Sequence, residues 1–359
     1  MVKEGVPCVG YGDIYMKYDN YHFNKAQSYV DEYTASDSQP ANKGTLFFTG
    51  TGETADEIGK CVCYTGEETI YVGGDIITFK PTGINPLFLT YQQYQPFSLK
   101  NKASFGQGHS VVHIQKDNLE KLSVAYPEDH DEQERIVQIL MKWDKAITIQ
   151  NKIIEKLRIK RKALLQILFN SKNVLNTKIR IGDFIQQRFE KNKNNITNIK
   201  SVSNLKGFID QRSQFSKIVA SDDISNYKVV RKNDIAYNPS RINVGSIAVY
   251  EDDAPGIISP MYVVFSCNNI SPKLLLLLLE SERGRYEIKS FLSGSVRNTL
   301  AFSDLCEIKL PHPSLNDSKI LKSFELIDSD IKINEKYFKV LKQQRKTLQQ
   351  YLINGIVRI

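Results

Sequence analysis

A few short motifs contain residue types that could bind a cofactor or perform catalysis. Thr49-Gly50-Thr51-Gly52-Glu53 has two glycines close together, but it lacks the third glycine and the strand–helix frame of a dinucleotide-binding loop. The chain has no GxxxxGK[ST] phosphate loop, so we expect no ATP hydrolysis in it. Asn238-Pro239-Ser240 differs at its third position from the Asn-Pro-Pro motif of adenine methyltransferases, which hold a flipped base, and no glycine-rich cofactor loop precedes it. We therefore predict no catalytic residue.

The cysteines and histidines do not form a metal-ligand pattern. Cys61 and Cys63 are one residue apart, and no second Cys or His pair follows at zinc spacing. On a strand, residues two apart face the same side, so both sulfurs are expected to pack as small apolar groups. Four of the five histidines precede residue 131 at irregular spacing. We expect no metal site, and the odd number of cysteines, five, favours reduced thiols in a cytoplasm.

Other polar residues are better suited to binding than to catalysis. Segment 294–299 combines a glycine with hydroxyl, amide and guanidinium groups, which can donate hydrogen bonds to phosphates and base edges. Segment 108–113 aligns with it but carries different side chains, and the loops near residues 49–53 and 238–243 differ in the same way. Each loop could instead be merely solvated. The candidate DNA-binding residues are Thr49, Thr51, His109, Ser110, Lys191, Lys193, Lys200, Asn238, Ser240, Arg241, Asn243, Ser295, Arg297, Asn298 and Thr299.

These loops need elements to position them, and the clearest are two long helical segments. Residues 134–169 align without a gap with residues 318–353, at a separation of 184. Apolar residues recur in steps of three and four along both, which is the pattern of a coiled-coil seam. Polar positions coincide too, Gln150 with Asn334 and Arg161 with Arg345. The predicted seam residues are Ile136, Leu140, Trp143, Ile147, Ile154, Leu157, Leu164, Ile320, Phe324, Ile327, Ile331, Phe338, Leu341 and Leu348.

The repeat continues upstream of the helices. Segments 105–127 and 291–313 align at a separation of 186, with glycines and apolar residues at matching places. Short predicted strands, such as 61–64 and 246–250, are followed by predicted helices at 86–93 and 274–279, which is typical of a compact α+β unit. We therefore predict an α+β fold with two similar mixed α/β domains, separated by two long helices that form an antiparallel coiled coil with pseudo-twofold symmetry.

The repeat also predicts the domain boundaries. Residues 1–130 and 171–316 are the two modules, and residues 131–170 and 317–359 are the long helices, with a polar connector at 171–180. At 1.5 Å per residue each helix would run on the order of 55 Å and would keep the modules apart.

The chain carries a net charge of +8, but its first module is acidic. Residues 1–130 hold 10 basic and 16 acidic residues, a net of −6, and no arginine. A basic chain favours a nucleic-acid partner without proving one. No apolar run approaches the roughly 20 residues of a membrane span, and the first residues do not resemble a secretory signal. We therefore expect a cytoplasmic protein.

The chain resembles the specificity subunits of type I restriction–modification systems. Their recognition domains close with a Gly-Ser-x-Arg loop and a Leu-x-x-Ile-x-Leu-Pro-x-Pro strand before a long helix. Here these read Gly294-Ser295-Val296-Arg297 and Leu305 to Pro313, with the helix from about Asp317. The first copy reads Leu119 to Pro127 and then Glu132-Gln133-Glu134-Arg135-Ile136, close to the family's helix entrance. The second copy has Asn316-Asp317 where that Glu-Gln pair would stand.

The resemblance implies a non-catalytic reader of double-stranded DNA from a bacterium or archaeon. Each target-recognition domain would read one half of a split target in the major groove, and the helices would set the gap. Two methyltransferase subunits, which bind S-adenosylmethionine, would assemble on this scaffold. Two restriction subunits join the full complexes of the family, and they use ATP and Mg²⁺. No cofactor would be held by this chain.

One departure concerns the first module. The second module opens with residues 179–200 before its SVSNLKGF segment, whereas the first reaches its corresponding segment within six residues of Met1. Its opening strand is therefore expected to be missing, replaced or supplied from elsewhere. Two alternatives to a DNA reader stay open: an antiparallel coiled-coil scaffold that binds proteins without DNA specificity, and an enzyme whose site lacks a recognisable motif.

Overall fold

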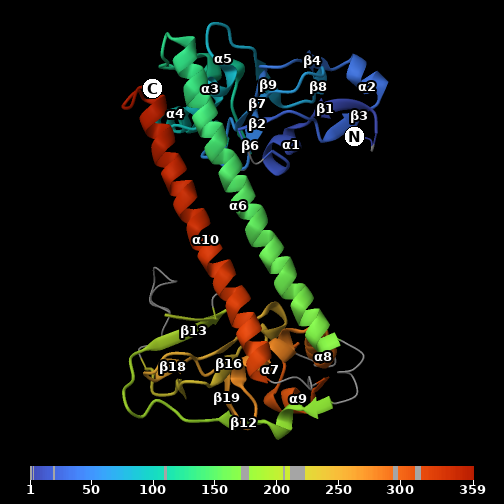
Figure 1. Cartoon of the computed structure of the whole chain (residues 1–359), viewed down its shortest axis with the longest axis vertical. Coiled ribbons are helices and arrows are strands. Elements are labelled where there is room, and N and C mark those ends of the chain that lie inside the picture. The colour runs from blue at the N-terminus through green and yellow to red at the C-terminus, as the bar shows by residue number, and fades with distance from the viewer. Residues whose placement is uncertain are drawn as a thin grey trace. The chain divides into compact units, whose positions relative to one another are not determined.

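The computed structural model describes residues 2, 4–18, 21–108, 111–170, 178–204, 207–210, 223–293, 298–311 and 317–359. The chain divides into two compact units. Unit 1 comprises Met1–Ile153 and Asn334–Ile359, and unit 2 comprises Ile154–Ile333. Each unit therefore contains one module of the repeat and a part of each long helix (Figure 1).

Unit 1 contains two four-stranded sheets, in the strand orders β3-β1-β8-β4 and β2-β7-β5-β9. The pairs β1–β8 and β2–β7 are parallel and the others are antiparallel. The bounds are β1 Val6–Val9, α1 Tyr11–Met16, β2 His22–Phe23, β3 Ser28–Val30, α2 Glu32–Ser36, β4 Gln39–Ala41, β5 Leu46–Thr49, β6 Thr51–Gly52, β7 Cys61–Tyr64, β8 Ile70–Val72, β9 Ile76–Phe79, α3 Pro86–Gln92, α4 Pro96–Phe105, β10 Val112–His113 and α5 Lys116–Glu120.

Unit 2 also contains two four-stranded sheets, ordered β14-β13-β18-β15 and β12-β19-β16-β17. The parallel pair β13–β18 corresponds to β1–β8 of unit 1. The bounds are β11 Lys178–Arg180, η1 Ile181–Asp183, β12 Ile185–Arg188, β13 Ile199–Ser203, β14 Gly207–Asp210, β15 Lys228–Val230, β16 Ile235–Tyr237, η3 Ile242–Val244, β17 Ile247–Val249, β18 Gly256–Ile258, β19 Val263–Cys267, α7 Pro272–Glu280, α8 Glu282–Ser293, α9 Phe302–Glu307 and β20 Lys309–Pro311.

The predicted mixed α/β fold is confirmed, and the strands predicted at 61–64 and 246–250 overlap β7 and β17. Three local predictions were wrong. The segment from Leu119 to Pro127, expected to match the family's closing strand, contains the end of α5 and no strand. Residues 178–180 of the expected connector form β11, which pairs with β20, because alternating polar residues do not prevent a short strand from pairing. The segment from Leu305 to Pro311, expected as a strand, begins as helix α9 and becomes strand β20 only at Lys309.

The two modules differ at one sheet edge. In unit 2, β12 extends the sheet beside β19, and β11 pairs with β20. In unit 1 the fourth strand, β2, adds to the opposite edge, beside β7. The outer edge of β9, which corresponds to β19, has no strand partner within the described ranges. The edge of β9 that would correspond to the β12 side of β19 is thus unpaired among the described residues.

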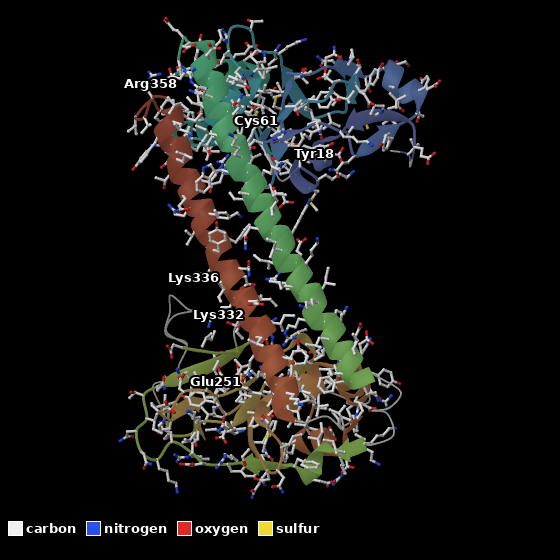
Figure 2. All side chains as sticks on the ribbon, viewed as in Figure 1. Tyr18, Cys61, Glu251, Lys332, Lys336 and Arg358 are labelled. Atoms are coloured by element: carbon white, nitrogen blue, oxygen red, sulfur yellow. The ribbon has the colours of Figure 1, made fainter. Side chains whose placement is uncertain are left out.

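Strand β7 explains how the core of unit 1 is layered. Its side chains alternate between the faces of the sheet. Cys61 and Cys63 pack with Leu46 on one face, while Val62 and Tyr64 belong to a second cluster on the other. Both thiols are buried and free, as the CxC pattern predicted, and Figure 2 shows Cys61 inside the module. The sheet is therefore buried on both sides, which explains its apolar strands.

The long helices are α6 (His130–Asn170) and α10 (Asp317–Ile353). In unit 1 the two helices run antiparallel. Asp144 contacts Arg345, and Gln150, which lies later in α6, contacts Asn334, which lies earlier in α10. The fourteen residues predicted for the seam are all buried or half-buried. No helix in the described ranges combines the length and apolar character needed to cross a membrane.

Candidate nucleic-acid interface

In unit 2, two predicted binding segments that lie far apart in the sequence are neighbours. The amide of Leu300 donates a hydrogen bond to the carbonyl of Pro239 at 3.0 Å. The Tyr237 hydroxyl, buried at the end of β16, donates to the carbonyl of Leu300 at 3.1 Å. The loop that begins at Asn238 is therefore joined to the segment that begins at Asn298. Sequence analysis predicted both segments but could not predict their contact.

The side chains of this joined surface have different roles. Ser240, Arg241, Asn243 and Asn298 are exposed, and the Arg241 guanidinium has no hydrogen-bond or ion-pair partner in the described part of the chain. Asn238 is buried, and its Oδ1 accepts a hydrogen bond from the Ser240 amide at 3.0 Å. Asn238 thus shapes the turn, while the exposed residues can offer donors to a ligand. Thr299 is half-buried.

Unit 1 reproduces this arrangement. The amide of Ile114 donates to the carbonyl of Gly50 at 2.9 Å, and β6 pairs with β10 in an antiparallel bridge. Ile114 and Leu300 are 186 residues apart, as the repeat predicts. The loop that follows β5 is therefore joined to the segment that follows α4, as the loop after β16 is joined to the segment after α8. The same framework carries different side chains in the two modules.

Thr49 does not reach solvent in this arrangement. It is fully buried, and its hydroxyl lies 2.9 Å from the Tyr15 hydroxyl and accepts from the Lys60 amide at 3.0 Å. Thr51 is half-buried. The exposed tip of the loop is 53–57, which contains three carboxylates. The threonines therefore shape this loop, and its acidic tip repels phosphates.

The predicted lysines are not equally available. Lys191 and Lys193 are exposed, and Lys191 donates to Asn226 at 3.1 Å. Lys200 forms ion pairs with Asp210 at 2.7 Å and Asp252 at 2.8 Å, and its side chain is only 10% exposed. A phosphate would have to compete with two carboxylates for Lys200. His109, Ser110, Ser295 and Arg297 lie outside the described residues.

The polar contacts between the long helices occur at positions that are related by the 184-residue repeat. In unit 1 Asp144 of α6 pairs with Arg345 of α10 at 2.8 Å, and in unit 2 Asp328 of α10 pairs with Arg161 of α6 at 2.6 Å. Asp328 is Asp144 plus 184, and Arg345 is Arg161 plus 184. Gln150 donates to Asn334, its own repeat counterpart, at 2.8 Å. Each ion pair therefore joins an aspartate of one repeat to an arginine of the other.

Each arginine also contacts a helix of its own module. Arg161 binds Glu280 at the end of α7 at 2.7 Å. Arg345 lies over the rings of Tyr21 and Tyr91, with its centre 4.3 and 5.2 Å from theirs, and Tyr91 belongs to α3. Helix α3 is well defined, because Asn85 accepts hydrogen bonds from the Leu87 and Phe88 amides and Pro86 opens the helix. Each arginine therefore ties both long helices to one module.

Apolar residues on the outer sides of the long helices were missed by the seam analysis. Ile149 and Ile333 are 49% and 62% exposed and are related by the repeat, as are Ile153 and Tyr337 and also Ile167 and Tyr351. Charged residues lie among them; Lys332 and Lys336 are exposed one turn apart on α10 (Figure 2). The signal was present in the sequence, because these apolar positions also recur at a separation of 184.

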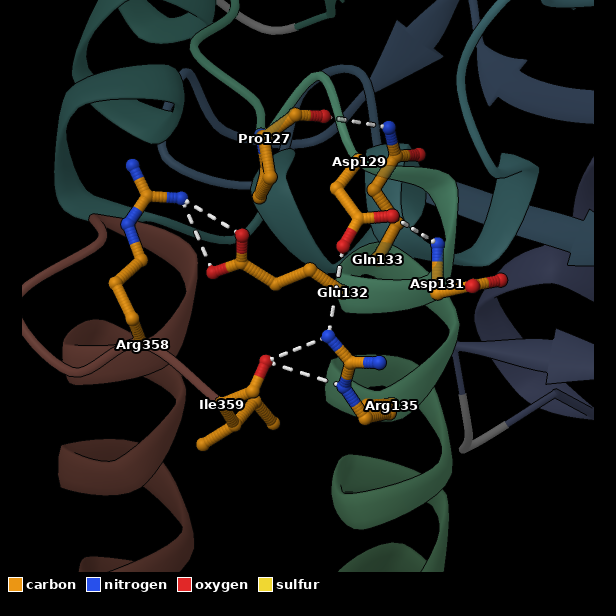
Figure 3. Close-up of polar contacts among 8 residues, drawn as sticks. All are labelled: Pro127, Asp129, Asp131, Glu132, Gln133, Arg135, Arg358 and Ile359. Atoms are coloured by element: carbon orange, nitrogen blue, oxygen red, sulfur yellow. Dashed lines mark hydrogen bonds and ion pairs between the residues drawn. The ribbon is translucent and has the colours of Figure 1, made fainter.

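The Glu-Gln pair at the entrance of α6 is built into unit 1 (Figure 3). Gln133 is fully buried, donates to the Pro127 carbonyl and accepts from the Asn85 amide, both at 2.7 Å. Glu132 pairs with Arg358 at 3.0 Å, and Arg135 donates to a backbone oxygen of Ile359 at 2.9 Å. The entrance of α6 is thus joined to the segment that follows α10.

The described ranges contain no cluster of side chains that could ligate a metal ion. No group of three or more His, Cys, Asp or Glu residues there could hold a metal ion. Burial raises the pKa of the Cys63 thiol to about 12, and the pKa of Cys61 is raised further. Both thiols stay protonated near neutral pH, so neither is a ready nucleophile.

Comparison with known proteins shows which family the chain resembles. Residues 9–158 match the family model described as type I restriction modification DNA specificity domain. The chain is 25% identical over 309 residues to the type I restriction enzyme MjaVIII specificity subunit of Methanocaldococcus jannaschii, covering 74% of this chain and 70% of that protein. That relative is thus the specificity subunit of a type I restriction enzyme.

Solved structures share the fold. The crystal structure of a type I restriction–modification system S subunit from M. genitalium has a TM-score of 0.55 at 16% identity, covering 98% of this chain and 92% of that chain. A chain from a structural study of complex assembly and conformational transition of the type I system has a TM-score of 0.53 at 12% identity, covering 88% and 83%.

Proposed function

We infer that this chain, whose residues 9–158 belong to the type I restriction–modification DNA specificity domain family and whose relatives are specificity subunits, reads a bipartite DNA target with a fixed gap. One observation carries the proposal. The backbone contact between two separate loops is repeated in both modules, from Leu300 to Pro239 and from Ile114 to Gly50, while the exposed side chains around it differ. One framework with two sets of side chains is suited to reading two different half-sites.

The domain boundaries follow from the same proposal. Residues 1–130 and 171–316 act as the target-recognition domains, and residues 131–170 and 317–359 as the spacer helices. The reciprocal pairs Asp144–Arg345 and Arg161–Asp328 support an antiparallel coiled coil with pseudo-twofold symmetry. Two half-sites on opposite strands would then meet the two modules in equivalent orientations, as palindromic sites meet symmetric dimers.

The partners are two methyltransferase subunits, joined by two restriction subunits where the system also cleaves DNA. Ile149 and its repeat counterpart Ile333 are exposed, as are Ile153 and its counterpart Tyr337. They support two methyltransferase subunits, because a twofold scaffold presents the same apolar surface twice. S-adenosylmethionine, ATP and Mg²⁺ are bound by those subunits, and the DNA target places the complex in the cytoplasm.

Electrostatics favour recognition within the assembly. The first module has a net charge of −6, and its loop tip at 53–57 is acidic. Phosphate contacts supply most of the sequence-independent affinity for DNA, so this chain alone should bind weakly. The methyltransferase subunits then contribute much of the backbone contact.

A selection experiment tests the proposal. The chain is purified with its methyltransferase subunits and incubated with a pool of randomised duplexes, and the bound duplexes are sequenced. We expect two short conserved blocks separated by a gap of constant length. Binding without any enriched motif contradicts the proposal and supports the first alternative, a coiled-coil scaffold without DNA specificity.

The spacer role of the helices has its own test. Inserting seven residues after Asn151 in α6 and after its counterpart Glu335 in α10 lengthens both helices by about 10 Å and preserves the seam pattern. We expect a wider gap with both half-sites unchanged. A change in the half-sites themselves contradicts the spacer role.

A further inference from the structure

We propose that Tyr15 is a positioning residue for recognition of the first half-site, acting through the loop at residues 50–60. The proposal rests on the function inferred above. It assigns a role in recognition to a residue that lies outside the loop at residues 50–60. Tyr15 lies on α1, outside both loops that form the candidate interface, and it is half-buried.

The Tyr15 hydroxyl joins the two sides of this loop. It lies 2.9 Å from Thr49 Oγ1 and 3.1 Å from the carbonyl oxygens of both Thr51 and Glu57. The Lys60 amide donates a hydrogen bond to Thr49 Oγ1 at 3.0 Å, which leaves the Thr49 hydroxyl free to donate to the Tyr15 oxygen. The Tyr15 hydroxyl then donates to one of the two carbonyl oxygens. One hydroxyl therefore connects the start of the loop with residues near its end.

The base of this contact is rigid. Asp13 accepts from the Gly10 amide at 2.8 Å and from the Ser28 hydroxyl at 2.8 Å, which fixes the first turn of α1 to β3. Lys60 Nζ lies 5.5 Å from the centre of the Tyr15 ring. Burial raises the pKa of Tyr15, so its hydroxyl keeps its hydrogen at neutral pH. Tyr15 is thus an anchored donor.

A second contact holds the end of the loop. Lys102 on α4 is 1% exposed, and its Nζ donates to the Gly59 carbonyl at 2.8 Å. Gly59 has a φ of +68°, a conformation that favours glycine. Residue 288, the repeat counterpart of Lys102, is isoleucine, so this contact is specific to unit 1.

The corresponding loop of unit 2 closes with its own residues. The Ser246 amide donates to the Arg241 carbonyl at 3.1 Å, and the Asn238 amide donates to the Ser246 carbonyl at 3.0 Å. The equivalent backbone bond of unit 1 runs from the Thr49 amide to the Lys60 carbonyl at 3.0 Å, and the Tyr15 hydroxyl adds a contact from a distant side chain to this closure. Loss of the Tyr15 hydroxyl should affect one half-site alone.

A conservative substitution isolates the hydroxyl. Tyr15→Phe keeps the ring and removes the contacts to Thr49, Thr51 and Glu57. In the duplex selection with the methyltransferase subunits, we expect base preference in the first half-site to fall about fivefold, because a hydrogen bond that orders a loop contributes on the order of 1 kcal/mol. Preference in the second half-site should match that of the parent chain.

Two further variants sharpen the test. Tyr11→Phe is the matched control, because the Tyr11 ring packs against Tyr15 at 5.2 Å and its hydroxyl makes no hydrogen bond with the described residues. Thr49→Val removes the other hydroxyl of the network with little change of shape. We expect Thr49→Val to reproduce the effect of Tyr15→Phe, and the double variant to show less than the sum of both, since they interrupt one network.

Two results overturn the proposal: Tyr15→Phe leaves the first half-site as sharply defined as in the parent, or it weakens both half-sites equally, which indicates a general loss of structure. Thermal unfolding of each variant is measured alongside, and Thr49→Val decides the question if Tyr15→Phe unfolds. A parent chain that enriches no gapped motif overturns the proposed function itself, which is a different outcome.

Discussion

The Tyr91 hydroxyl donates a hydrogen bond to Asp144 at 2.7 Å, on the same carboxylate that pairs with Arg345 at 2.8 Å. Burial and the charge of Asp144 raise the pKa of Tyr91, so the phenol remains a donor. Gln349 on α10 donates to the backbone carbonyl of Tyr91 at 2.6 Å. These contacts join the module helix α3 to both long helices in the interior of unit 1.

The repeat supplies a matched pair of substitutions for this ion pair. Asp144→Ala leaves the guanidinium of Arg345, whose side chain is 5% exposed, without its carboxylate. We expect a loss of about 3–5 kcal/mol in the free energy of unfolding, as for other broken buried pairs. Asp328→Ala breaks the equivalent pair of unit 2, where Asp328 is 48% exposed, and should cost less than about 1 kcal/mol. Urea unfolding of both variants checks this; equal losses contradict it.

Lys102 predicts a pH dependence of stability. Burial lowers its pKa to about 8, whereas an unfolded lysine titrates near 10.4. Between these values the unfolded chain binds more protons, so the contribution of Lys102 to the free energy of unfolding rises with pH by up to about 1.4 kcal/mol per pH unit. Cys61 and Tyr94 face Lys102 and titrate at still higher pH.

The measurement is therefore a difference between two variants. Lys102→Met removes the ammonium and keeps Cys61 and Tyr94. We expect the free energy of unfolding of the parent, minus that of Lys102→Met, to increase from pH 7 to pH 10. A difference that is independent of pH shows that the ammonium is not buried in the folded protein.

Sequence analysis could predict the elements of this fold because their signals are local or repeated. The CxC pattern predicted a strand with both sulfurs on one face, and Cys61 and Cys63 are indeed in one cluster. The spacing of 184 revealed Gln150 and Asn334 as counterparts. It could not reveal that they bond to each other, because that requires an antiparallel pairing whose centre lies near these residues.

The candidate interface was less predictable for a physical reason. A threonine next to glycines is equally compatible with an exposed loop and with a buried hydroxyl that shapes the loop. Thr49 is the second kind, because Tyr15 comes from another element to meet it. Lys200 is likewise neutralised by Asp210 and Asp252, from β14 and from the segment before β18. Such contacts between distant positions carry no signal in a single sequence.

The outer apolar residues of the long helices predict how many partners bind. Ile149→Glu and Ile333→Glu each place a charge on one of two repeat-related positions that are already exposed, so the stability of the chain should change by less than about 0.5 kcal/mol. We expect either variant to bind one methyltransferase subunit instead of two, and the double variant to bind neither, because burying an unpaired charge opposes docking.

Mass measurement of the assembled complexes counts the bound subunits. Gln343→Glu, at another exposed position of α10, is the matched control and should still bind two. A double Ile149→Glu, Ile333→Glu variant that retains both subunits places the partner surface elsewhere.

Arg241 predicts a base contact in the second half-site. Its guanidinium is exposed beside the junction of Pro239 and Leu300 and is unpaired among the described residues. Arginine binds the major-groove edge of guanine through two hydrogen bonds, and such a contact contributes about 1–3 kcal/mol of discrimination between bases. Arg241→Ala should therefore relax one position of the second half-site by about tenfold or more, and leave the first half-site unchanged. Lys309→Ala, which removes an exposed charge on β20, should leave both half-sites as they are. A uniform weakening by Arg241→Ala, with every base preference retained, would assign Arg241 to the phosphate backbone instead, because a phosphate contact adds affinity without selecting a sequence.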